Sequence, residues 1–447
     1  MYGLSPREVR FALLISSTHF VQHTYYRILP PLIPVLAVAL EYPLWQLGLL
    51  ITFYSVSMGI AHAPLGILAD RINRRYLLSV GIGLTGGAYV LFAFGMNLGT
   101  VIPTLAVRGH IFEGGYLVMS LAMMIVGIGL AVVHPAGYPM ITDNVDFENK
   151  GKVLGLFGAS SKLGDGATPA IIAGMILVLG WQEIILLFGI AGIIYGAALH
   201  IALRADEYDT VPAATRTSET ADSAPTPFRD DHRGFLYPLV VIYLFFVTSD
   251  LTNRGLATFL PAFLVAVYAY SFEFMGLQIG SESVANLYFA LLLFAGAGMQ
   301  LVLGRMTDEY DPRNLLIGLM VLASLGMVAL AVFHLSVISL ILVIFILGTG
   351  LYGVNPPRDA IISDISPPEY EGRTFGYIFT AAILTGSIYP TVVGYVLEVF
   401  GMREGFLILV VGTLLATASV MLLYSERIYH QSGRGRVTMA DDTGQST

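Results

Sequence analysis

Long apolar runs alternate with short charged stretches along most of this chain. A helix needs roughly 20 apolar residues to cross a hydrocarbon core of about 30 Å, and the runs reach that length. Bounded by charges and turn residues, they predict twelve helices: Phe11–Leu40, Trp45–Leu68, Tyr76–Met96, Gly115–Ile141, Val153–Leu179, Ile184–Leu203, Phe235–Val267, Val284–Leu303, Leu315–Phe333, Val337–Ile362, Phe375–Phe400 and Phe406–Tyr424. The pattern therefore predicts an all-α integral membrane protein.

The composition agrees with this prediction. Of the 447 residues, 55% are hydrophobic and 12% are charged, and the mean hydropathy is +0.74, whereas soluble domains carry about 25% charged residues. A soluble enzyme, a secreted disulfide scaffold and a nucleic-acid binder are poor interpretations. The chain has no cysteine, which excludes disulfides and thiolate metal sites.

A polar, acidic gap separates the first six helices from the last six. Such a composition is typical of a flexible linker, and polar chain ends are typically disordered. We therefore expect an N-terminal six-helix bundle over residues 1–203, a cytoplasmic linker over 204–234, a C-terminal six-helix bundle over 235–426 and a disordered cytoplasmic tail over 427–447.

The loops predict the orientation, because cytoplasmic loops carry the excess of Lys and Arg. With the N-terminus inside, only Arg108 and Arg403 fall in external loops. Four more cations lie within predicted helices: Arg27, Lys162, Arg254 and Arg358. All the others are then cytoplasmic. We expect a multi-pass protein of the plasma (inner) membrane of a prokaryote, with both termini cytoplasmic and the first helix retained as an anchor, since its apolar run is too long for a cleaved signal.

The chain contains an internal repeat. HPAGYPMITDNVDFENKGKVLG aligns without gaps on NPPRDAIISDISPPEYEGRTFG, pairing Pro135 with Pro356. The first helix also aligns on the seventh, with His19 on Asp250 and His23 on Arg254. Aligned Pro, Gly and Asp over this length are not expected from shared apolar composition alone. Parallel repeats of this kind are a transporter architecture, with the binding site near the midplane between the halves.

The chain resembles the major facilitator superfamily over essentially its whole length. The residues that carry the resemblance are the repeat and the stretch GILADRINRR, which is similar to the cytoplasmic signature of that superfamily. LGLLITFYSVSMGIAHAPLGILADR is similar to the fosmidomycin-resistance-like group of drug exporters. The resemblance implies a cytoplasmic gating motif that sets the inward–outward equilibrium, formed by Gly66, Asp70, Arg71, Arg74, Arg75 and Asp308; alternatively, its arginines serve topology alone. Antiporters of the superfamily tend to have a Gly-Pro pair in helix five, whereas this chain has Thr168-Pro169, which weakens the case for antiport.

Polar residues inside the helices are the candidate site, because an ionised side chain at the membrane centre costs about 2.5–3.5 kcal/mol. The candidate substrate and proton pathway comprises His19, Gln22, His23, Arg27, His134, Lys162, Asp165, Asp250, Asn253, Arg254, Asn355 and Arg358. The four helix cations are expected to bind an anionic group, with Asp250 or a histidine exchanging a proton. Tyr25, Tyr54, Tyr377 and Tyr389 are candidate walls.

A competing interpretation is that some of these charges only neutralise one another and lock helices together. The candidate pairs are Lys162–Asp165, Asp250–Arg254 and Arg358–Asp359. In that case the pairs have a structural role and the substrate binds elsewhere.

No phosphate-binding loop or metalloprotease motif is present, so we expect no enzyme, no cofactor and no metal, and an ion gradient as the energy source. The expected partners are a small-molecule substrate, protons or another coupling ion and the lipid bilayer, with no nucleic acid and a monomeric chain. The first hypothesis is proton-coupled efflux of a small anionic or amphiphilic compound by drug/proton antiport. The second is proton-coupled uptake of an organic anion such as a carboxylate. The third is a non-transporting membrane sensor.

Overall fold

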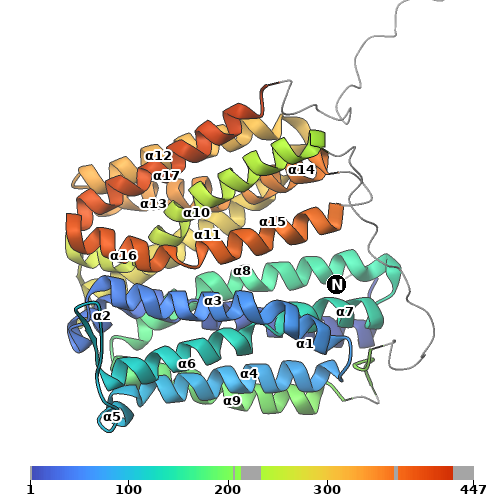
Figure 1. Cartoon of the computed structure of the whole chain (residues 1–447), viewed down its shortest axis with the longest axis horizontal. Helices are drawn as coiled ribbons and strands as arrows, with labels where there is room; N and C mark the ends of the chain where they lie inside the picture. The colour runs from blue at the N-terminus through green and yellow to red at the C-terminus, as the bar shows by residue number, and fades with distance from the viewer. Residues whose placement is uncertain (1–2, 205–206, 213–232, 367–370, 426–447) are drawn as a thin grey trace, which may run out of the picture.

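Two helical bundles lie side by side in the computed structural model, which describes residues 3–204, 207–212, 233–366 and 371–425 (Figure 1). The N-terminal bundle contains α1 (Pro6–Tyr26), α2 (Leu29–Leu40), α3 (Leu44–Ala69), α4 (Arg74–Ala93), α5 (Gly95–Gly99), α6 (Gly114–Leu130), α7 (Val133–Asn144), the 3₁₀ turn η1 (Phe147–Asn149), α8 (Lys150–Met175) and α9 (Trp181–Ala202). The C-terminal bundle contains α10 (Arg233–Val267), α11 (Ser281–Glu309), α12 (Pro312–Val332), α13 (Val337–Tyr352), α14 (Asn355–Ile365), α15 (Glu371–Gly386), α16 (Tyr389–Phe400) and α17 (Met402–Leu422).

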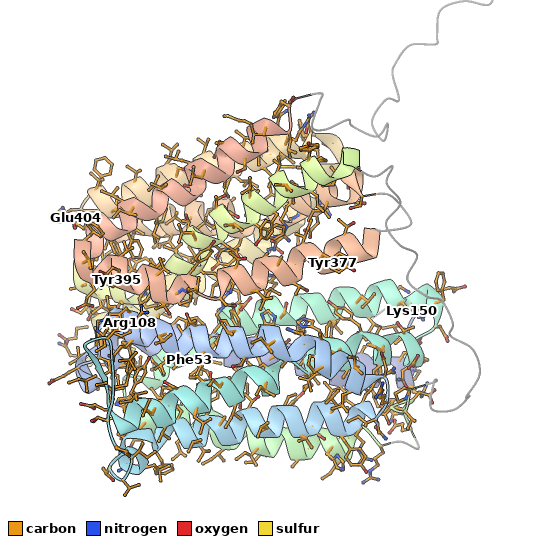
Figure 2. The ribbon with its side chains drawn as sticks, viewed as in Figure 1. Phe53, Arg108, Lys150, Tyr377, Tyr395 and Glu404 are labelled. Atoms are coloured by element: carbon orange, nitrogen blue, oxygen red, sulfur yellow. The ribbon has the colours of Figure 1, made fainter. Side chains whose placement is uncertain are left out.

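Two short antiparallel hairpins mark one end of the molecule. Strand β1 (Leu105–Val107) pairs with β2 (His110–Phe112), and β3 (Phe272–Phe274) pairs with β4 (Leu277–Ile279). We call this the hairpin end, and the opposite end, where α1 begins and α17 ends, the termini end. Figure 2 places Arg108 and Glu404 at the hairpin end and Lys150 at the termini end.

The all-α membrane fold predicted from the sequence is confirmed. In the described part of the chain, 10 helices are long and apolar enough to cross a membrane. The other two of the twelve predicted membrane helices are the pair α1–α2 and the helix α8. Both are less apolar than the ten, because they carry polar side chains such as His23 and Asp165. Large apolar side chains such as Val38, which is 82% exposed, cover the outer surface, where lipid rather than water surrounds them.

Five of the predicted helices are each broken into two, and in four of them the second piece has a proline within its first three residues. These prolines are Pro30 in α2, Pro135 in α7, Pro356 in α14 and Pro390 in α16. Proline has no N–H to donate to the preceding turn, but its fixed φ suits the start of a helix. Two of the breaks, at Arg27–Ile28 and Ser387–Ile388, lie beside the site described below.

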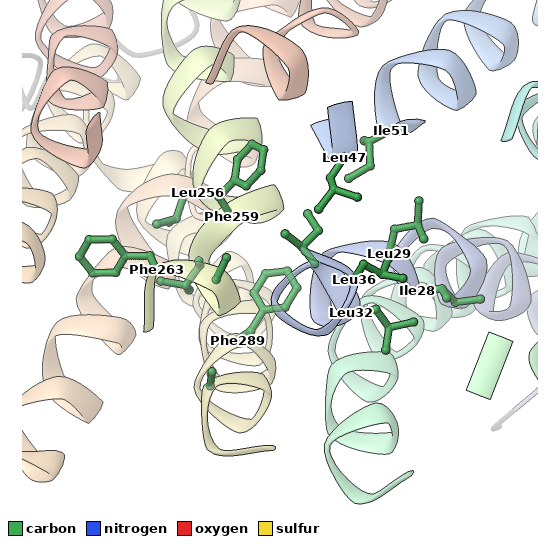
Figure 3. Packing of buried hydrophobic residues seen from close by; sticks show 14 of the residues in the cluster. Ile28, Leu29, Leu32, Leu36, Leu47, Ile51, Leu256, Phe259, Phe263 and Phe289 are labelled. Atoms are coloured by element: carbon green, nitrogen blue, oxygen red, sulfur yellow. The ribbon is translucent and has the colours of Figure 1, made fainter. Parts of the chain in front are cut away.

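At the hairpin end the two bundles are in close contact. Figure 3 shows Leu47 of α3 and apolar side chains of α2 beside Phe259 and Phe289 of the other bundle, in one buried cluster. The hydroxyls of Thr52 and Thr391 are 2.7 Å apart across this interface. A Cβ placed on Gly48 would lie 2.2 Å from the carbonyl oxygen of Pro390. The hairpin end is therefore closed.

Toward the termini end the same helices diverge. In the α8–α11 pair, Gly166 packs against Phe294, but a Cβ placed on Gly158 or Gly298 would have no atom within 4 Å. In the pair formed by α3 and α15, Gly59 contacts Leu384, whereas Gly66 and Gly376 again meet nothing within that distance. Figure 1 shows α8 and α15 spreading apart at this end. The interface between the bundles therefore opens toward the termini end.

Part of the predicted linker is ordered against the N-terminal bundle. Tyr208 is buried beside Phe11, with ring centroids 5.4 Å apart, and the backbone N–H of Arg74 donates to the carbonyl of Thr210 at 2.9 Å. Residues 207–212 are therefore packed rather than flexible, because an aromatic side chain can bury its ring there. The rest of the linker, 213–232, and the tail, 427–447, lie outside the described residues.

The start of α1 is fixed by a capping box ahead of its apolar part. The Glu8 carboxylate accepts from the backbone N–H of Ser5 at 2.8 Å, and the backbone N–H of Glu8 donates to the Ser5 hydroxyl. The N–H of Asp146 and the amide of Asn149 donate to the same carboxylate. The hydrogen bond from Ser5, followed by those from Asp146 and Asn149, lowers the pKa of Glu8 from 4.5 to about 2 despite burial.

Candidate functional site

A cavity of about 170 Å³ lies between the two bundles, inside the closed hairpin end. Both bundles line it. The lining residues are Tyr26, Arg27, Pro30, Ile51, Tyr54, Ser55, Asp250, Asn253, Arg254, Ala257, Thr258, Tyr352 and Pro390. The cavity thus lies between the two halves of the repeat.

On the N-terminal side, Arg27 sits at the break between α1 and α2. Its Nε donates to Oδ1 of Asp165 at 2.7 Å, and the two side chains are only 10% and 8% exposed. The guanidinium also lies 4.9 Å from the ring centroid of Tyr26. Asp165 thus pairs with a cation of another helix rather than with its own neighbour Lys162, because it faces α1 across the bundle.

On the C-terminal side, Arg254 pairs with Asp250 one turn earlier on α10, as their spacing predicts. Nε of Arg254 donates to Oδ2 of Asp250 at 3.0 Å. Gly386, at the end of α15, makes room for this pair: a Cβ there would lie 2.4 Å from Nε of Arg254 and 2.9 Å from Oδ2 of Asp250. The cavity therefore has one carboxylate-held arginine on each side.

The cavity wall also presents neutral polar groups. The hydroxyls of Tyr54 and Tyr352 are buried and have no hydrogen-bond partner among the described residues. Ser55 and Thr258 add hydroxyls, and Asn253 donates to the carbonyl of Leu351 at 3.4 Å. Sequence reasoning missed Tyr352; the signal available was its place just before Gly353 and the paired prolines that break the helix.

The predicted histidines lie together, but behind the cavity rather than in its wall. The ring of His19 is 4.9 Å from that of His23 and 5.0 Å from that of His134, which is 6.1 Å from His62. Gln22 is buried and donates to the carbonyl of Leu130 at 2.8 Å. Across the described residues, no group of three or more His, Asp or Glu has a metal-binding arrangement.

The predicted cluster of four cations is not formed in this conformation. Arg358 pairs with Asp359 at 2.8 Å, and its guanidinium lies 4.5 Å from the ring centroid of Phe246, outside the cavity. Lys162 is partly buried on α8, and Asn355 begins α14; neither lines the cavity. Helix rotation determines this outcome, which the sequence pattern does not specify.

Of the predicted tyrosine walls, only Tyr54 lines the cavity. Tyr25 instead donates to the carbonyl of Phe188, and Tyr389 donates to that of Val247 at 2.8 Å. Tyr377 is 64% exposed near the open end (Figure 2). Tyrosine content alone therefore did not identify the wall.

The predicted gating motif lies at the termini end, where its members differ in burial. Arg74 is buried and donates to Asp143 of α7 at 2.6 Å and to the carbonyl of Ala69 at 3.1 Å. Arg75 donates to the carbonyl of His200 on α9. The remaining charged members are exposed: Asp70, Arg71 and Asp308. The inter-helix contacts that the resemblance implies are thus present for the two inner arginines.

Comparison with known proteins gives both sequence and structural similarity. The chain is 27% identical over 269 residues to the "Probable L-galactonate transporter" of Escherichia coli strain K12, covering 59% of this chain and 53% of that protein. It is 32% identical over 137 residues to the "Probable sulfoacetate transporter SauU" of Cupriavidus necator, covering 31% of each. Each match thus spans about half or less of the relative's own length.

A solved structure supports the fold. A bacterial homolog of the human lysosomal transporter Spinster superposes with a TM-score of 0.73 at 16% identity, over 94% of this chain and 97% of that chain. Residues 15–281 and 254–439 match the sequence profile of the Major Facilitator Superfamily, which together is most of the chain. The protein therefore belongs to the Major Facilitator Superfamily and is a multi-pass membrane protein.

Proposed function

We propose that this transporter takes up a small organic anion together with protons, holding the anion between Arg27 and Arg254. The observation that carries the proposal is that these two arginines, from opposite bundles, line one small cavity with polar walls. This is the second of the hypotheses drawn from the sequence, with the anion site reduced from four cations to two.

The donor geometry suits a carboxylate or sulfonate. Each arginine gives its Nε to a carboxylate, Asp165 or Asp250, which leaves its terminal Nη groups for a ligand in the cavity. A guanidinium offers a planar fork of donors that matches an oxyanion. The Tyr54 hydroxyl, which has no partner among the described residues, suits a further oxygen of the substrate, and the Tyr352 hydroxyl interacts with Arg27 at the same place.

The size of the cavity favours a small substrate. Pockets for drug-sized ligands typically enclose about 300–1,000 Å³, whereas this cavity measures about 170 Å³. The two relatives, named as probable L-galactonate and sulfoacetate transporters, point to the same class of compound. A short hydroxylated or sulfonated carboxylate is therefore the substrate class proposed.

The arrangement of the ion pairs is compatible with rocking of one bundle against the other. Arg27 and Asp165 both belong to the N-terminal bundle, and Arg254 and Asp250 both belong to α10. Rocking would therefore break neither pair, while the closed hairpin end and the open termini end exchange roles. In the orientation expected from the loop charges, the cavity now opens toward the cytoplasm.

The test uses purified protein in vesicles that contain a pH-sensitive dye, with L-galactonate, sulfoacetate or neutral galactose added outside. Acidification of the interior with an anion, but not with galactose, is the expected result. Arg254→Gln should abolish it, whereas Arg358→Gln, which changes another intramembrane arginine outside the cavity, should retain most of it. Equal loss in both variants, or no anion flux at all, contradicts the proposal.

The other two hypotheses remain predictions that the same assay addresses. Drug/proton antiport, expected from the fosmidomycin-resistance-like resemblance, requires alkalinisation of the interior by an amphiphilic compound. A non-transporting sensor requires saturable anion binding without flux.

A further inference from the structure

Four histidines form a row from the open end of the interface to the ion pair of Arg27. The row consists of His62, His134, His19 and His23, which belong to α3, α7 and α1. His62 lies one helical turn before Gly66 on the open side. The last member, His23, places Nδ1 3.2 Å from Oδ1 of Asp165. The row therefore connects the open side to the carboxylate that holds Arg27.

The hydrogen bonding of His19 identifies its proton acceptor. Its Nδ1 lies 2.7 Å from the carbonyl oxygen of Phe157, and a carbonyl can only accept, so Nδ1 carries a hydrogen. In the neutral ring Nε2 is then the acceptor. This atom is buried and has no partner among the described residues, and the residue as a whole is 5% exposed. A buried acceptor without a donor is an unsatisfied polar atom, and a proton bound there would satisfy it.

Asp165 is shared unequally between two possible donors. Nε of Arg27 donates to Oδ1 at 2.7 Å, whereas Nδ1 of His23 is 3.2 Å from that oxygen without the geometry of a hydrogen bond. A neutral His23 competes weakly with a guanidinium. A protonated one would be a second cation against the same carboxylate oxygen.

We propose that a proton on the His19–His23 pair draws Asp165 away from Arg27, and so frees the whole guanidinium, Nε as well as the Nη groups, to bind the anion tightly in the cavity. This inference rests on the proposed function and assigns its proton site. The proton enters along the row from the open side and binds an imidazole nitrogen. No other covalent bond forms or breaks. When the proton leaves, Asp165 recaptures Arg27 and the anion is released.

The surrounding charges give the coupling its sign. The groups that face the pair are His134 of α7, Lys162 and Asp165 of α8 and Arg27 of α1, while Tyr352 of α13 faces Asp165. Without ligands, Arg27 and Lys162 outweigh Asp165 by one positive charge. Binding of a proton adds a second positive charge, and binding of a monovalent anion neutralises one. Each ligand therefore favours binding of the other, and the effect is reciprocal.

The experiment measures the Kd of L-galactonate, with sulfoacetate as a second probe, for the full-length protein in detergent between pH 8 and pH 6. We expect wild-type affinity to rise as the pH falls, by up to about tenfold per pH unit for one linked proton. The variant His19→Gln/His23→Gln should bind weakly at every pH, because Arg27 is never released. Asp165→Asn should bind tightly at every pH, because Arg27 is always free. His200→Gln, a histidine of the same bundle outside the row, should behave like wild type.

The outcomes separate the two proposals. Anion binding by the wild type that is equal at pH 6 and pH 8 leaves the proposed function standing and overturns the proton site. A normal pH slope in the double histidine variant, or weak binding by Asp165→Asn, overturns it too. No anion binding at any pH removes the proposed function and this inference with it. If the double variant does not fold, His23→Gln alone, whose side chain is 24% exposed, gives the same test.

Discussion

The two bundles place charge around the cavity in different ways, although the sequence repeat relates them. In the N-terminal bundle, Arg27 takes its carboxylate from a second helix, α8, with histidines alongside. In the C-terminal bundle, Arg254 takes its carboxylate from its own helix. One half therefore holds its arginine and carboxylate beside a row of imidazoles, and the other half holds a permanent ion pair.

The repeat makes the difference specific. His19 and His23 occupy the positions of Asp250 and Arg254 in the aligned helices. Continued without gaps, the other alignment places Asp165 on Gly386. The N-terminal bundle has the Asp165 carboxylate facing α1 at this position, whereas the C-terminal bundle has Gly386, which has no side chain. Arg254 and Asp250 fill the space beside Gly386. The comparison suggests a proton-responsive half and a half that serves as a fixed anion anchor.

The largest expected effect comes from breaking the permanent pair. Arg254→Gln leaves Asp250 partly buried without its cation, and removing one partner of a buried pair costs about 3–5 kcal/mol; exposure of about a fifth of each side chain places this variant toward the lower value. Thermal unfolding in detergent measures the loss. The double variant Arg254→Gln/Asp250→Asn should recover stability but not anion binding. Wild-type binding by the double variant would remove the anchor role of Arg254.

The next effect concerns the first turn of α1, which holds the N-terminal bundle at its termini end. The hydrogen bonds to Glu8 lower its pKa from 4.5 to about 2, so its charge stabilises the folded state above pH 4.5, and this contribution is lost as the pH falls toward 2. Glu8→Gln should lower the unfolding temperature at pH 7, and the gap to wild type should close as the pH falls below 4.5. Glu148→Gln, an exposed neighbour, should show no gap at pH 7. A gap for Glu8→Gln that stays constant with pH would contradict this origin.

A smaller effect tests whether the position next to Arg254 must be a glycine, Gly386. Gly386→Ala forces a methyl group against the Arg254–Asp250 pair and should cost about 1–3 kcal/mol, as overpacking does, and it should weaken anion binding. The control is Gly376→Ala in the same helix, where a Cβ meets no atom within 4 Å. Equal unfolding temperatures for the two variants would show that the close approach at Gly386 is not needed.

The smallest effect concerns a helix cap in the other bundle, Asp311, which caps α12. Partial burial acts to raise its pKa, but the hydrogen bonds from Arg313 outweigh burial and lower it. Asp311→Asn should cost less than about 1 kcal/mol, because Asn caps a helix as well as Asp and partly exposed ion pairs contribute little. The difference in unfolding temperature should shrink further at high salt. A loss as large as that of Glu8→Gln would remove this contrast between the bundles.

Much of the fold could be predicted because its signals are local. Apolar run length gives the crossings, and the prolines that follow Arg27 and Ser387 coincide with helix breaks. The candidate site was only partly predictable. Arg27 and Arg254 were expected in it and line the cavity, whereas Arg358 was expected there and lies between Phe246 and Phe379. Tyr352 was not expected, because its place beside a helix break was the available signal and a tyrosine in an apolar helix does not by itself show which way it faces.

The sequence by itself determined that this chain is a membrane protein with two related bundles, and it singled out the rare charges within its helices as candidates for the site. Those conclusions follow from hydropathy, periodicity and the cost of a charge in hydrocarbon, all of which belong to single segments. Only the tertiary structure decided which partner each charge takes. Asp165 meets Arg27 and His23 instead of Lys162, because pairing depends on how neighbouring helices are rotated and how far they slide, and side chains from both bundles together set that packing.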